Sequence, residues 1–156
     1  MKSYIGTKII TAKPMTRKEA EELLKRDIGG NETGDGYLVQ YENSYQSWSP
    51  KSVFDTAYRP SLGMTFGDAI NALKVGCRVA RAGWNGKNMW LVLVPGTQEA
   101  QLREGTPYRT ALGQESCEIL PHIDMWTVNA SGRRAMLPGW VASQTDMLSE
   151  DWEIIG

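Results

Sequence analysis

The segment of residues 64–156 begins with a pattern of apolar positions that predicts a capped helix. Thr65 is followed three residues later by Asp68, a spacing typical of a helix start in which each residue caps the other. Apolar residues then recur at helical spacing, and Gly76 ends the pattern. The apolar face consists of Phe66, Ala69, Ile70 and Leu73. We therefore expect this helix to bury one face against the rest of the segment.

The remainder of the segment alternates in a way that predicts strands joined by turns. Strands are expected at residues 78–81, 89–94, 119–128, 133–137 and 152–155. Asn85 and Gly86 form a strong hairpin-turn signal. Residues 129–132 predict a further turn, and residues 140–147 a turn or a short helical segment. Residues 97–118 are polar and acidic and contain glycine, which predicts a long loop or an excursion from the sheet.

The strand at residues 89–94 differs from the others because both of its faces are apolar. Its sequence is Met-Trp-Leu-Val-Leu-Val, so no side of the strand suits contact with water. A small sheet with a single helix can cover only one of these faces. The pattern therefore predicts that the second face is buried against another subunit.

Residues 1–60 show their own series of elements. An extended stretch over residues 4–12 stops at Pro14, and Thr16 with Glu19 predicts a capped helix that ends at Gly29 and Gly30. Residues 37–41 and 45–48 predict a hairpin around residues 42–44. Pro50 is expected at the first position of a second helix, with an apolar stripe made of Val53, Phe54, Ala57 and Tyr58.

A boundary follows from the proline and glycine residues at positions 59–63 and from a change in aromatic composition. Five of the six tyrosines precede it, and five of the six tryptophans follow it. We therefore expect an α+β protein with two domains. A small α+β accessory module occupies residues 1–60, and residues 64–156 form a helix packed on an antiparallel sheet that assembles as a homo-oligomer.

Composition excludes several functional classes. Cys77 and Cys117 are too few for a disulfide framework or a zinc site, and His122 is the single histidine, so we expect no metal and no cofactor. The net charge of −1 argues against a protein that binds long nucleic acid. No apolar run approaches the roughly 20 residues of a membrane span, and no signal peptide is evident. We expect a soluble, intracellular protein.

The first candidate site lies at residues 81–90. Trp84 and Trp90 offer flat faces for a base, Arg81 and Lys87 offer positive charge for phosphates, and Asn85 lies in a turn whose glycines allow close approach of a ligand. The spacing of a standard phosphate-binding loop is absent. A hairpin with a tryptophan packed beneath it explains the same residues without a ligand.

The second candidate site is a run of four hydrogen-bonding side chains between apolar neighbours: Ser143, Gln144, Thr145 and Asp146. Short polar side chains with apolar walls are suited to reading a base edge or a ribose hydroxyl. Capping of a helical turn by Ser143 or Thr145 is the alternative.

A third group lies on the strand at residues 119–128. Asp124 and Asp146 together would be a carboxylate pair for acid–base chemistry, but nothing in the sequence sets their separation. For Met125 and Trp126 we expect core packing. His122 lacks the orienting partner that a catalytic triad requires. We therefore expect no catalytic residues.

Three motifs in the second segment resemble the phage family of type-two Thoeris anti-defence proteins. They are Met-Thr-Phe-Gly-Asp-Ala-Ile at 64–70, Arg-Ala-Gly-Trp-Asn-Gly-Lys at 81–87, and Trp-Val-Ala-Ser-Gln-Thr-Asp-Met-Leu at 140–148 with Glu-Asp-Trp-Glu at 150–153. The resemblance covers nearly all of residues 64–156. The shortest family members consist of this segment alone, so residues 1–60 are an additional phage-type module of unknown role.

The resemblance implies a protein that sequesters immune signals without degrading them. Members of the family bind glyco-cyclic ADP-ribose, some also bind cyclic dinucleotides at a separate site, and they act as homotetramers in the cytoplasm of the infected host. It implies ligand-binding roles for Trp84, Asn85, Ser143, Gln144, Thr145 and Asp146, to which the chemistry of the side chains adds Arg81, Lys87 and Trp90. The alternatives are an enzyme that hydrolyses the same nucleotides and a protein-interaction module that acts on a host factor.

Overall fold

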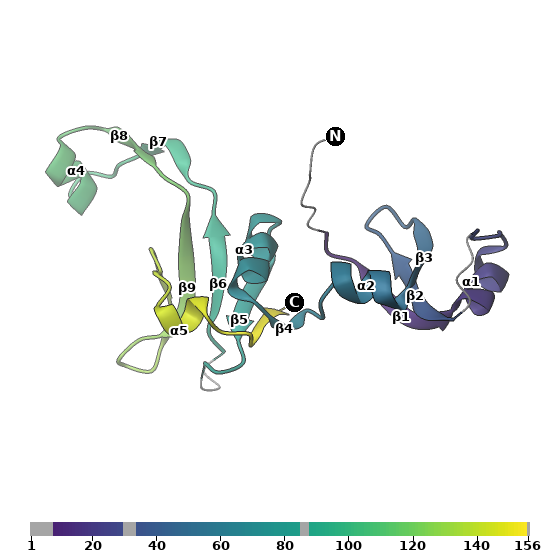
Figure 1. Ribbon diagram of the computed structural model, residues 1–156. Helices are drawn as coiled ribbons and strands as arrows, with labels where there is room; N and C mark the ends of the chain where they lie inside the picture. The colour runs from purple at the N-terminus through teal and green to yellow at the C-terminus, as the bar shows by residue number, and fades with distance from the viewer. Residues whose placement is uncertain (1–7, 30–33, 85–87, 156) are drawn as a thin grey trace. The chain divides into compact units, whose positions relative to one another are not determined.

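The computed structural model describes residues 8–29, 34–84 and 88–155. The chain divides into two compact units, residues 1–60 and residues 61–156, which are coloured from purple to blue and from teal to yellow in Figure 1. Both units mix helices with antiparallel strands, so the predicted α+β class is confirmed.

The N-terminal unit is a three-stranded antiparallel sheet with two helices. Its elements are β1 (Thr11–Thr16), α1 (Arg17–Leu24), β2 (Asp35–Gln40), β3 (Gln46–Pro50) and α2 (Lys51–Ala57), and the strand order is β1-β2-β3. The predicted capping box between Thr16 and Glu19 is present. The predicted hairpin is also confirmed, because β2 and β3 pair antiparallel.

Three boundaries in the N-terminal unit differ from the sequence prediction. β1 begins at Thr11 and continues through Pro14, which a strand can accommodate because β1 lies at the edge of its sheet. The first helix ends at Leu24, where Lys25 takes a left-handed conformation, and does not reach Gly29. Residues 4–7 and Gly30 lie outside the described residues.

The second helix of this unit also departs in detail from its predicted stripe. Pro50 occupies the N-cap position, one residue before the first helical turn. Phe54 stacks on Tyr37 of β2, with ring centroids 4.0 Å apart, and lies 4.9 Å from the ring of Tyr58. Val53 is exposed, and so is Ala57. The packing face is therefore narrower than the predicted stripe, and Phe54 provides the ring contact between this helix and β2.

The C-terminal unit is built on a six-stranded antiparallel sheet with the order β10-β9-β6-β5-β11-β4. Its strands are β4 (Leu62–Met64), β5 (Arg78–Arg81), β6 (Trp90–Val94), β9 (His122–Val128), β10 (Arg134–Leu137) and β11 (Trp152–Ile155). The chain ends by inserting β11 between β4 and β5, so the two ends of this unit lie next to each other in the sheet.

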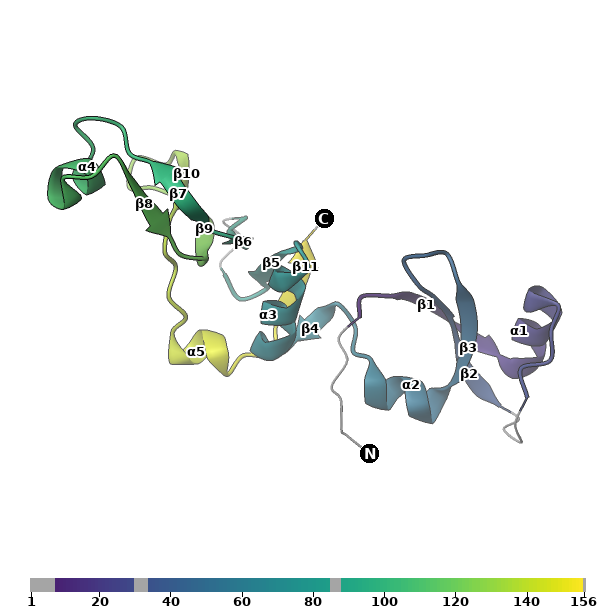
Figure 2. The ribbon, with the colours of Figure 1, turned by 90° about the horizontal axis from the view of Figure 1, so that it is seen from above.

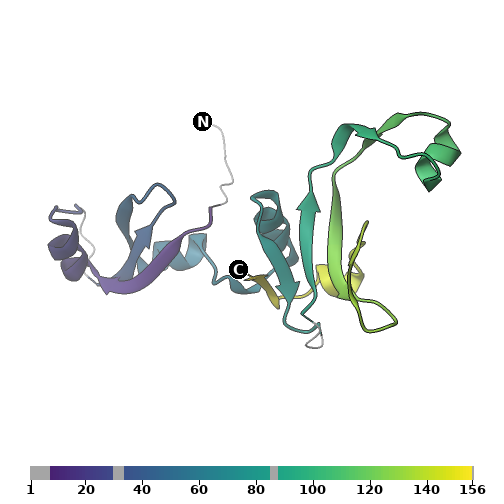
Figure 3. The same cartoon turned by 180° about the vertical axis from the view of Figure 1, so that it is seen from behind.

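Helix α3 (Phe66–Lys74) covers one face of this sheet, as the sequence predicts. Its capping box between Thr65 and Asp68 is present, and the Gly76 amide donates to the carbonyl of Leu73 at the C-terminal end. The core between helix and sheet contains Ala69, Ala72, Leu73, Val79, Leu91 and Trp152, all buried. Figure 3 shows α3 beside β5 and β6 from behind.

The other face of the sheet carries a second set of apolar side chains. Trp90 pairs with Trp126 across β6 and β9, and their rings stack with centroids 5.8 Å apart and an interplanar angle of 22°. Val92 and Val94 lie on the same face and are half-buried. Helix α3 packs on the opposite face, with Val79 and Leu91. The prediction that strand 89–94 has two apolar faces is confirmed; its burial against another subunit stays a prediction.

Of the two alternatives predicted for residues 97–118, the loop is wrong, because this segment is an excursion from the six-stranded sheet that contains two strands and a helix. β7 (Thr97–Gln101) pairs antiparallel with β8 (Ser116–Ile119), and α4 (Pro107–Leu112) lies between them. Figures 1 and 2 show this arm extending from the end of β6 and β9, away from α3. The predicted strand at 119–128 is accordingly divided at Leu120 and Pro121 into β8 and β9.

Candidate functional site

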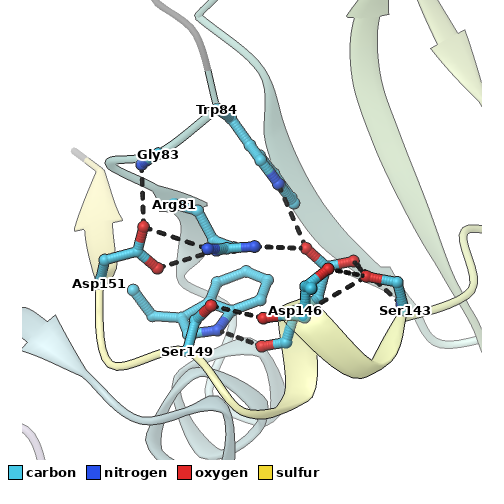
Figure 4. A network of polar contacts seen from close by, with 9 residues as sticks. Arg81, Gly83, Trp84, Ser143, Asp146, Ser149 and Asp151 are labelled. Atoms are coloured by element: carbon cyan, nitrogen blue, oxygen red, sulfur yellow. Dashed lines mark hydrogen bonds and ion pairs between the residues drawn. The ribbon is translucent and has the colours of Figure 1, made fainter.

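Arg81, the last residue of β5, is the centre of a polar network in the C-terminal unit (Figure 4). Its Nε donates to Oδ1 of Asp151 at 2.8 Å, and its Nη2 donates to Oδ2 of the same carboxylate at 3.3 Å. Its Nη1 donates to Oδ1 of Asp146 at 2.8 Å. The guanidinium therefore binds two carboxylates at once, and 16% of its side chain is exposed.

Asp146 lies in α5 (Gln144–Met147), and its two carboxylate oxygens have different partners. Oδ2 accepts from the backbone N–H of Ser143 at 2.9 Å and from its hydroxyl at 2.6 Å, while the Asp146 amide donates back to that hydroxyl. Oδ1 accepts from Arg81 and, at 3.4 Å, from Nε1 of Trp84. One carboxylate thus closes the capping box of α5 and joins this helix to the 81–84 segment.

Asp151 precedes β11 and holds the turn that follows β5. Its Oδ2 accepts from the backbone N–H of Gly83 at 2.9 Å, and its carbonyl accepts from the amide of Ala82 at 2.9 Å. The amide of Trp84 donates to the carbonyl of Arg81 at 3.1 Å, which closes the turn. The start of the 82–84 turn is therefore held by a residue that lies 70 positions from Arg81 in the chain.

Aromatic rings form the floor of this network. The indole of Trp84 meets Trp152 edge-on at 5.4 Å and Trp140 at 6.1 Å. Trp152 is fully buried, and its Nε1 donates to the carbonyl of Asp146 at 3.0 Å. The network therefore rests on the core of the unit, where a low local dielectric strengthens its ion pairs.

The charges of this network hold its carboxylates in the ionised form. The hydrogen bond from Arg81 lowers the pKa of Asp151 against the opposing effect of burial, and the Gly83 amide adds to the lowering. Burial raises the pKa of Asp146, but hydrogen bonds from Ser143, Arg81 and Trp84 together outweigh it, so this pKa also lies below its ordinary value. The bond to Asp151 is the main cause that raises the pKa of Arg81.

The structure brings together four of the residues that the sequence nominated: Arg81, Trp84, Ser143 and Asp146. The side chains of Gln144 and Thr145 are exposed beside them on α5, where the hydroxyl of Thr145 lies 2.8 Å from that of Ser143. The capping role that was the alternative for Ser143 is present. Arg81 contacts carboxylates rather than lying open.

Trp90 lies apart from this group. Val79 pairs with Leu91, so Trp90 lies on the opposite face of the sheet from Val79 and Arg81. The guanidinium of Arg78 lies 5.2 Å from the centre of the Trp90 ring. Asn85 and Lys87, together with the predicted turn at Asn85 and Gly86, lie outside the described residues. Ligand-binding roles for these residues remain predictions.

The third group of residues separates into different environments. Asp124 is buried on β9, where it accepts from the amide of Gly139 at 3.1 Å and lies 3.5 Å from Nε2 of His122. Met125 packs against the core under α3, as expected. Trp126 instead stacks on Trp90 on the opposite face. The strand alternation explains this division, because neighbouring residues point to opposite faces.

Asp151, Trp140 and Trp152 belong to the network although sequence reasoning assigned none of them to a site. Gly83, which lay inside the first candidate segment, contributes its backbone amide. Asp151 and Trp152 were visible only as part of a motif, because no local spacing connects them with Arg81. Among the residues that the structure describes, no group of three or more histidine, cysteine or acidic side chains could hold a metal ion. No helix in the described part of the chain is long and apolar enough to span a membrane.

Comparison with known proteins identifies relatives of the C-terminal unit. Residues 64–155 match the family model described as Tad2-like, the Thoeris anti-defense 2-like domain. The chain is also similar to Thoeris anti-defense 2 of Bacillus phage SP01, with 36% identity over 92 residues, which are 59% of this chain and 94% of that protein. The family match includes the 81–84 and 143–151 segments that the polar network joins.

Proposed function

This chain belongs to the family of Thoeris anti-defense 2-like proteins, and from this premise we propose that it binds and sequesters cyclic-nucleotide immune signals without degrading them. The proposed ligand is glyco-cyclic ADP-ribose, with cyclic dinucleotides at a separate site. In this proposal the protein acts in the cytoplasm of the infected bacterial host, where it inhibits Thoeris defence and immunity based on cyclic oligonucleotides.

The observation that carries the proposal is the contact between two motif segments that are distant in the chain. Asp146 accepts from Arg81 at 2.8 Å and from the Trp84 indole at 3.4 Å. These contacts join a half-buried tryptophan to α5, the helix that carries the exposed hydrogen-bonding side chains of Gln144 and Thr145. A flat ring for a base beside groups that suit ribose hydroxyls is a combination that fits a nucleotide.

The same contacts favour binding over chemistry. A general acid or base works best when its pKa lies near the operating pH. Asp146 and Asp151 both have a pKa below the ordinary value because they accept hydrogen bonds from Arg81 and neighbouring groups. These carboxylates are therefore poorly suited to proton transfer at neutral pH, which supports sequestration rather than hydrolysis.

Assembly as a homotetramer is part of the proposal, and the apolar second face of the sheet supports it. Trp90, Val92 and Trp126 are half-buried on that face, and Met136 on the edge strand β10 is 40% exposed. An exposed apolar face of this kind is typical of a protein interface. Two further large apolar side chains, Tyr108 and Leu112, are exposed on the arm.

Light scattering on the purified chain tests the assembly, with an expected mass of four times the 17.4 kDa protomer. Met136→Glu puts a charge on the apolar face and is expected to reduce the mass while the protomer stays folded, because this side chain is already partly exposed. Val53→Glu, at an exposed site in the N-terminal unit, is the matched control. A mass of one protomer for the unmodified chain would refute the tetramer.

Calorimetric titration with glyco-cyclic ADP-ribose, followed by heat denaturation and recovery of the ligand, tests the function. A sequestering protein neutralises one ligand per site, so we expect a submicromolar Kd, about −8 kcal/mol or better, and intact ligand after release. Recovery of cleaved ligand would indicate the hydrolytic alternative. Absence of binding to this ligand and to cyclic dinucleotides would favour a protein-interaction module.

Trp84→Ala is the informative variant for the site, because it removes the ring and keeps both carboxylates that bind Arg81. We expect weaker binding by at least about tenfold, the usual value of stacking a base on an aromatic ring. Tyr45→Ala, which removes a 51% exposed ring from the N-terminal unit, is the control and should leave the Kd unchanged. Equal affinities for Trp84→Ala and the unmodified protein would remove Trp84 from the site.

A further inference from the structure

We propose that Asp151 is a positioning residue of the ligand site, which acts by holding Arg81 and the 82–84 turn so that the Trp84 ring is presented to the ligand. This inference rests on the proposed function. It also changes the role of Arg81, from a direct ligand of phosphate to the central member of an internal clamp formed with Asp146 and Asp151.

The contacts of Asp151 reach both the side chain and the backbone of the turn. Its carboxylate accepts from Nε and Nη2 of Arg81, at 2.8 and 3.3 Å, and from the Gly83 amide at 2.9 Å. Its own carbonyl accepts from the Ala82 amide at 2.9 Å. Paired bonds between a guanidinium and a carboxylate define orientation as well as contact. Asp151 therefore determines where the chain leaves β5.

Gly83 makes this close approach possible. A Cβ atom at position 83 would lie 2.8 Å from Oδ2 of Asp151, closer than ordinary carbon–oxygen contacts allow. The absence of a side chain thus lets the backbone amide reach the carboxylate. A larger residue at this position would push the turn and the Asp151 carboxylate apart without altering any charge, which provides an independent way to disturb the clamp.

The clamp also fixes the position of Trp84 at two points, its backbone amide and the Nε1 of its indole. Its backbone amide donates to the carbonyl of Arg81, and its Nε1 donates to Asp146, which Arg81 itself binds. The ring is therefore supported from its main chain and from its tip by groups that converge on one guanidinium. Loss of Asp151 would loosen both supports, although Asp151 does not contact the ring.

Electrostatics argue against direct phosphate binding by Arg81. Its three guanidinium nitrogens donate to two carboxylates, so the clamp carries one positive and two negative charges. An anionic ligand that displaced these carboxylates would leave them without their partner in a partly buried site, which is unfavourable. The clamp is thus better suited to orientation than to attraction of phosphate.

The two roles of Arg81 predict effects of opposite sign for Asp151→Asn. If Arg81 bound phosphate, removal of a competing carboxylate would free its charge and tighten binding of an anionic ligand. If Asp151 positions the turn, the same change weakens binding by about tenfold, because an orienting charge-assisted hydrogen bond is lost. Calorimetric titration with glyco-cyclic ADP-ribose measures the sign directly.

Asp124→Asn is the matched control, since Asp124 is a carboxylate of the same unit that also accepts from a backbone amide, that of Gly139, and is more deeply buried than Asp151. Its Kd should stay unchanged. Gly83→Ala should weaken binding in the same direction as Asp151→Asn, and it serves if Asp151→Asn fails to fold. Unchanged or tighter binding by a folded Asp151→Asn protein, or an equal loss in Asp124→Asn, would overturn the inference.

Near-ultraviolet circular dichroism of the ligand-free protein separates this inference from the proposed function. The edge-on packing of Trp84 on Trp140 and Trp152 should give a strong aromatic signal. Asp151→Asn should reduce that signal, whereas Asp124→Asn should not. If the unmodified protein binds no cyclic nucleotide, the proposed function fails. An unchanged aromatic signal in Asp151→Asn shows instead that Asp151 does not position Trp84.

Discussion

Trp152 donates its indole N–H to the backbone carbonyl of Asp146 at 3.0 Å, from the centre of the core of the C-terminal unit. The same Asp146 presents its carboxylate to Arg81 and Trp84. A fully buried side chain thus supports the helix whose acidic residue organises the polar network. The stability of the core and the geometry of the network are therefore coupled through α5.

Trp152→Phe keeps an aromatic ring in the core but removes the donor to Asp146. We expect the free energy of unfolding to fall by about 1–3 kcal/mol, because a buried carbonyl loses its hydrogen bond. Urea denaturation followed by circular dichroism measures this change. Trp140→Phe, in the same aromatic cluster but only half-buried, should cost less. An equal cost for both variants would mean that ring volume, not the hydrogen bond, dominates.

Ser143→Ala removes the cap of α5. The hydroxyl of Ser143 accepts from the amide of Asp146 and donates to its carboxylate, so the change removes both of these bonds. The bond from the backbone N–H of residue 143 to the Asp146 carboxylate remains. Loss of an N-cap serine costs about 0.5–2 kcal/mol in general. Thermal denaturation should show this loss, and Ser143→Thr should recover most of it because threonine also caps helices. Unchanged stability of Ser143→Ala would mean that the cap contributes little here.

The acid limb of the stability curve should depend on Asp151. Its pKa is lowered in the folded protein, chiefly by Arg81, so its contribution to stability is present above the unfolded carboxyl value of about 3.9 and is lost as the pH falls through the lower folded value. Unfolding measured between about pH 2 and pH 6 should therefore show a shallower acid limb for Asp151→Asn. Identical slopes below the unfolded pKa would contradict the assignment.

Gly36→Ala should destabilise the N-terminal unit specifically. A Cβ atom at this position of β2 would lie 2.5 Å from the ring of Trp48 and would also collide with the carbonyl oxygen of Ser49. Overpacking of this kind typically costs about 1–3 kcal/mol. Gly67→Ala in α3 is the control, because its nearest atom is 3.8 Å away and alanine favours a helix. Hydrogen exchange of β2 and β3 amides would reveal the loss.

The helix starts of this protein could be read directly from the sequence. Thr16 with Glu19 and Thr65 with Asp68 each form the capping box that their spacing predicts. Such boxes depend on residues three positions apart, and the geometry of a helical turn brings these together without help from the rest of the chain. The apolar face of α3 follows equally from local periodicity.

The arm at residues 97–119 shows where local reading fails. Polar residues and glycine predicted a loop, yet β7 and β8 pair with each other through contacts between residues as distant as Thr97 and Ile119. At Pro14 the error was the opposite one. The strand was expected to stop there, but β1 continues, because proline breaks an inner strand and is tolerated at an edge. Pairing partners and edge positions are properties of the assembled sheet, and local patterns carry no record of them.

The polar network was likewise predictable only in part from the sequence. Amino-acid sequence alone was sufficient to nominate Arg81, Trp84, Ser143 and Asp146, because charge, aromaticity and hydrogen-bonding capacity are properties of single residues. Only the fold joined them, and only the fold added Asp151, which lies 70 residues from Arg81 and reaches it because β11 pairs with β5. Strand pairing places distant residues within hydrogen-bond range, so the partners of a charged side chain depend on tertiary structure.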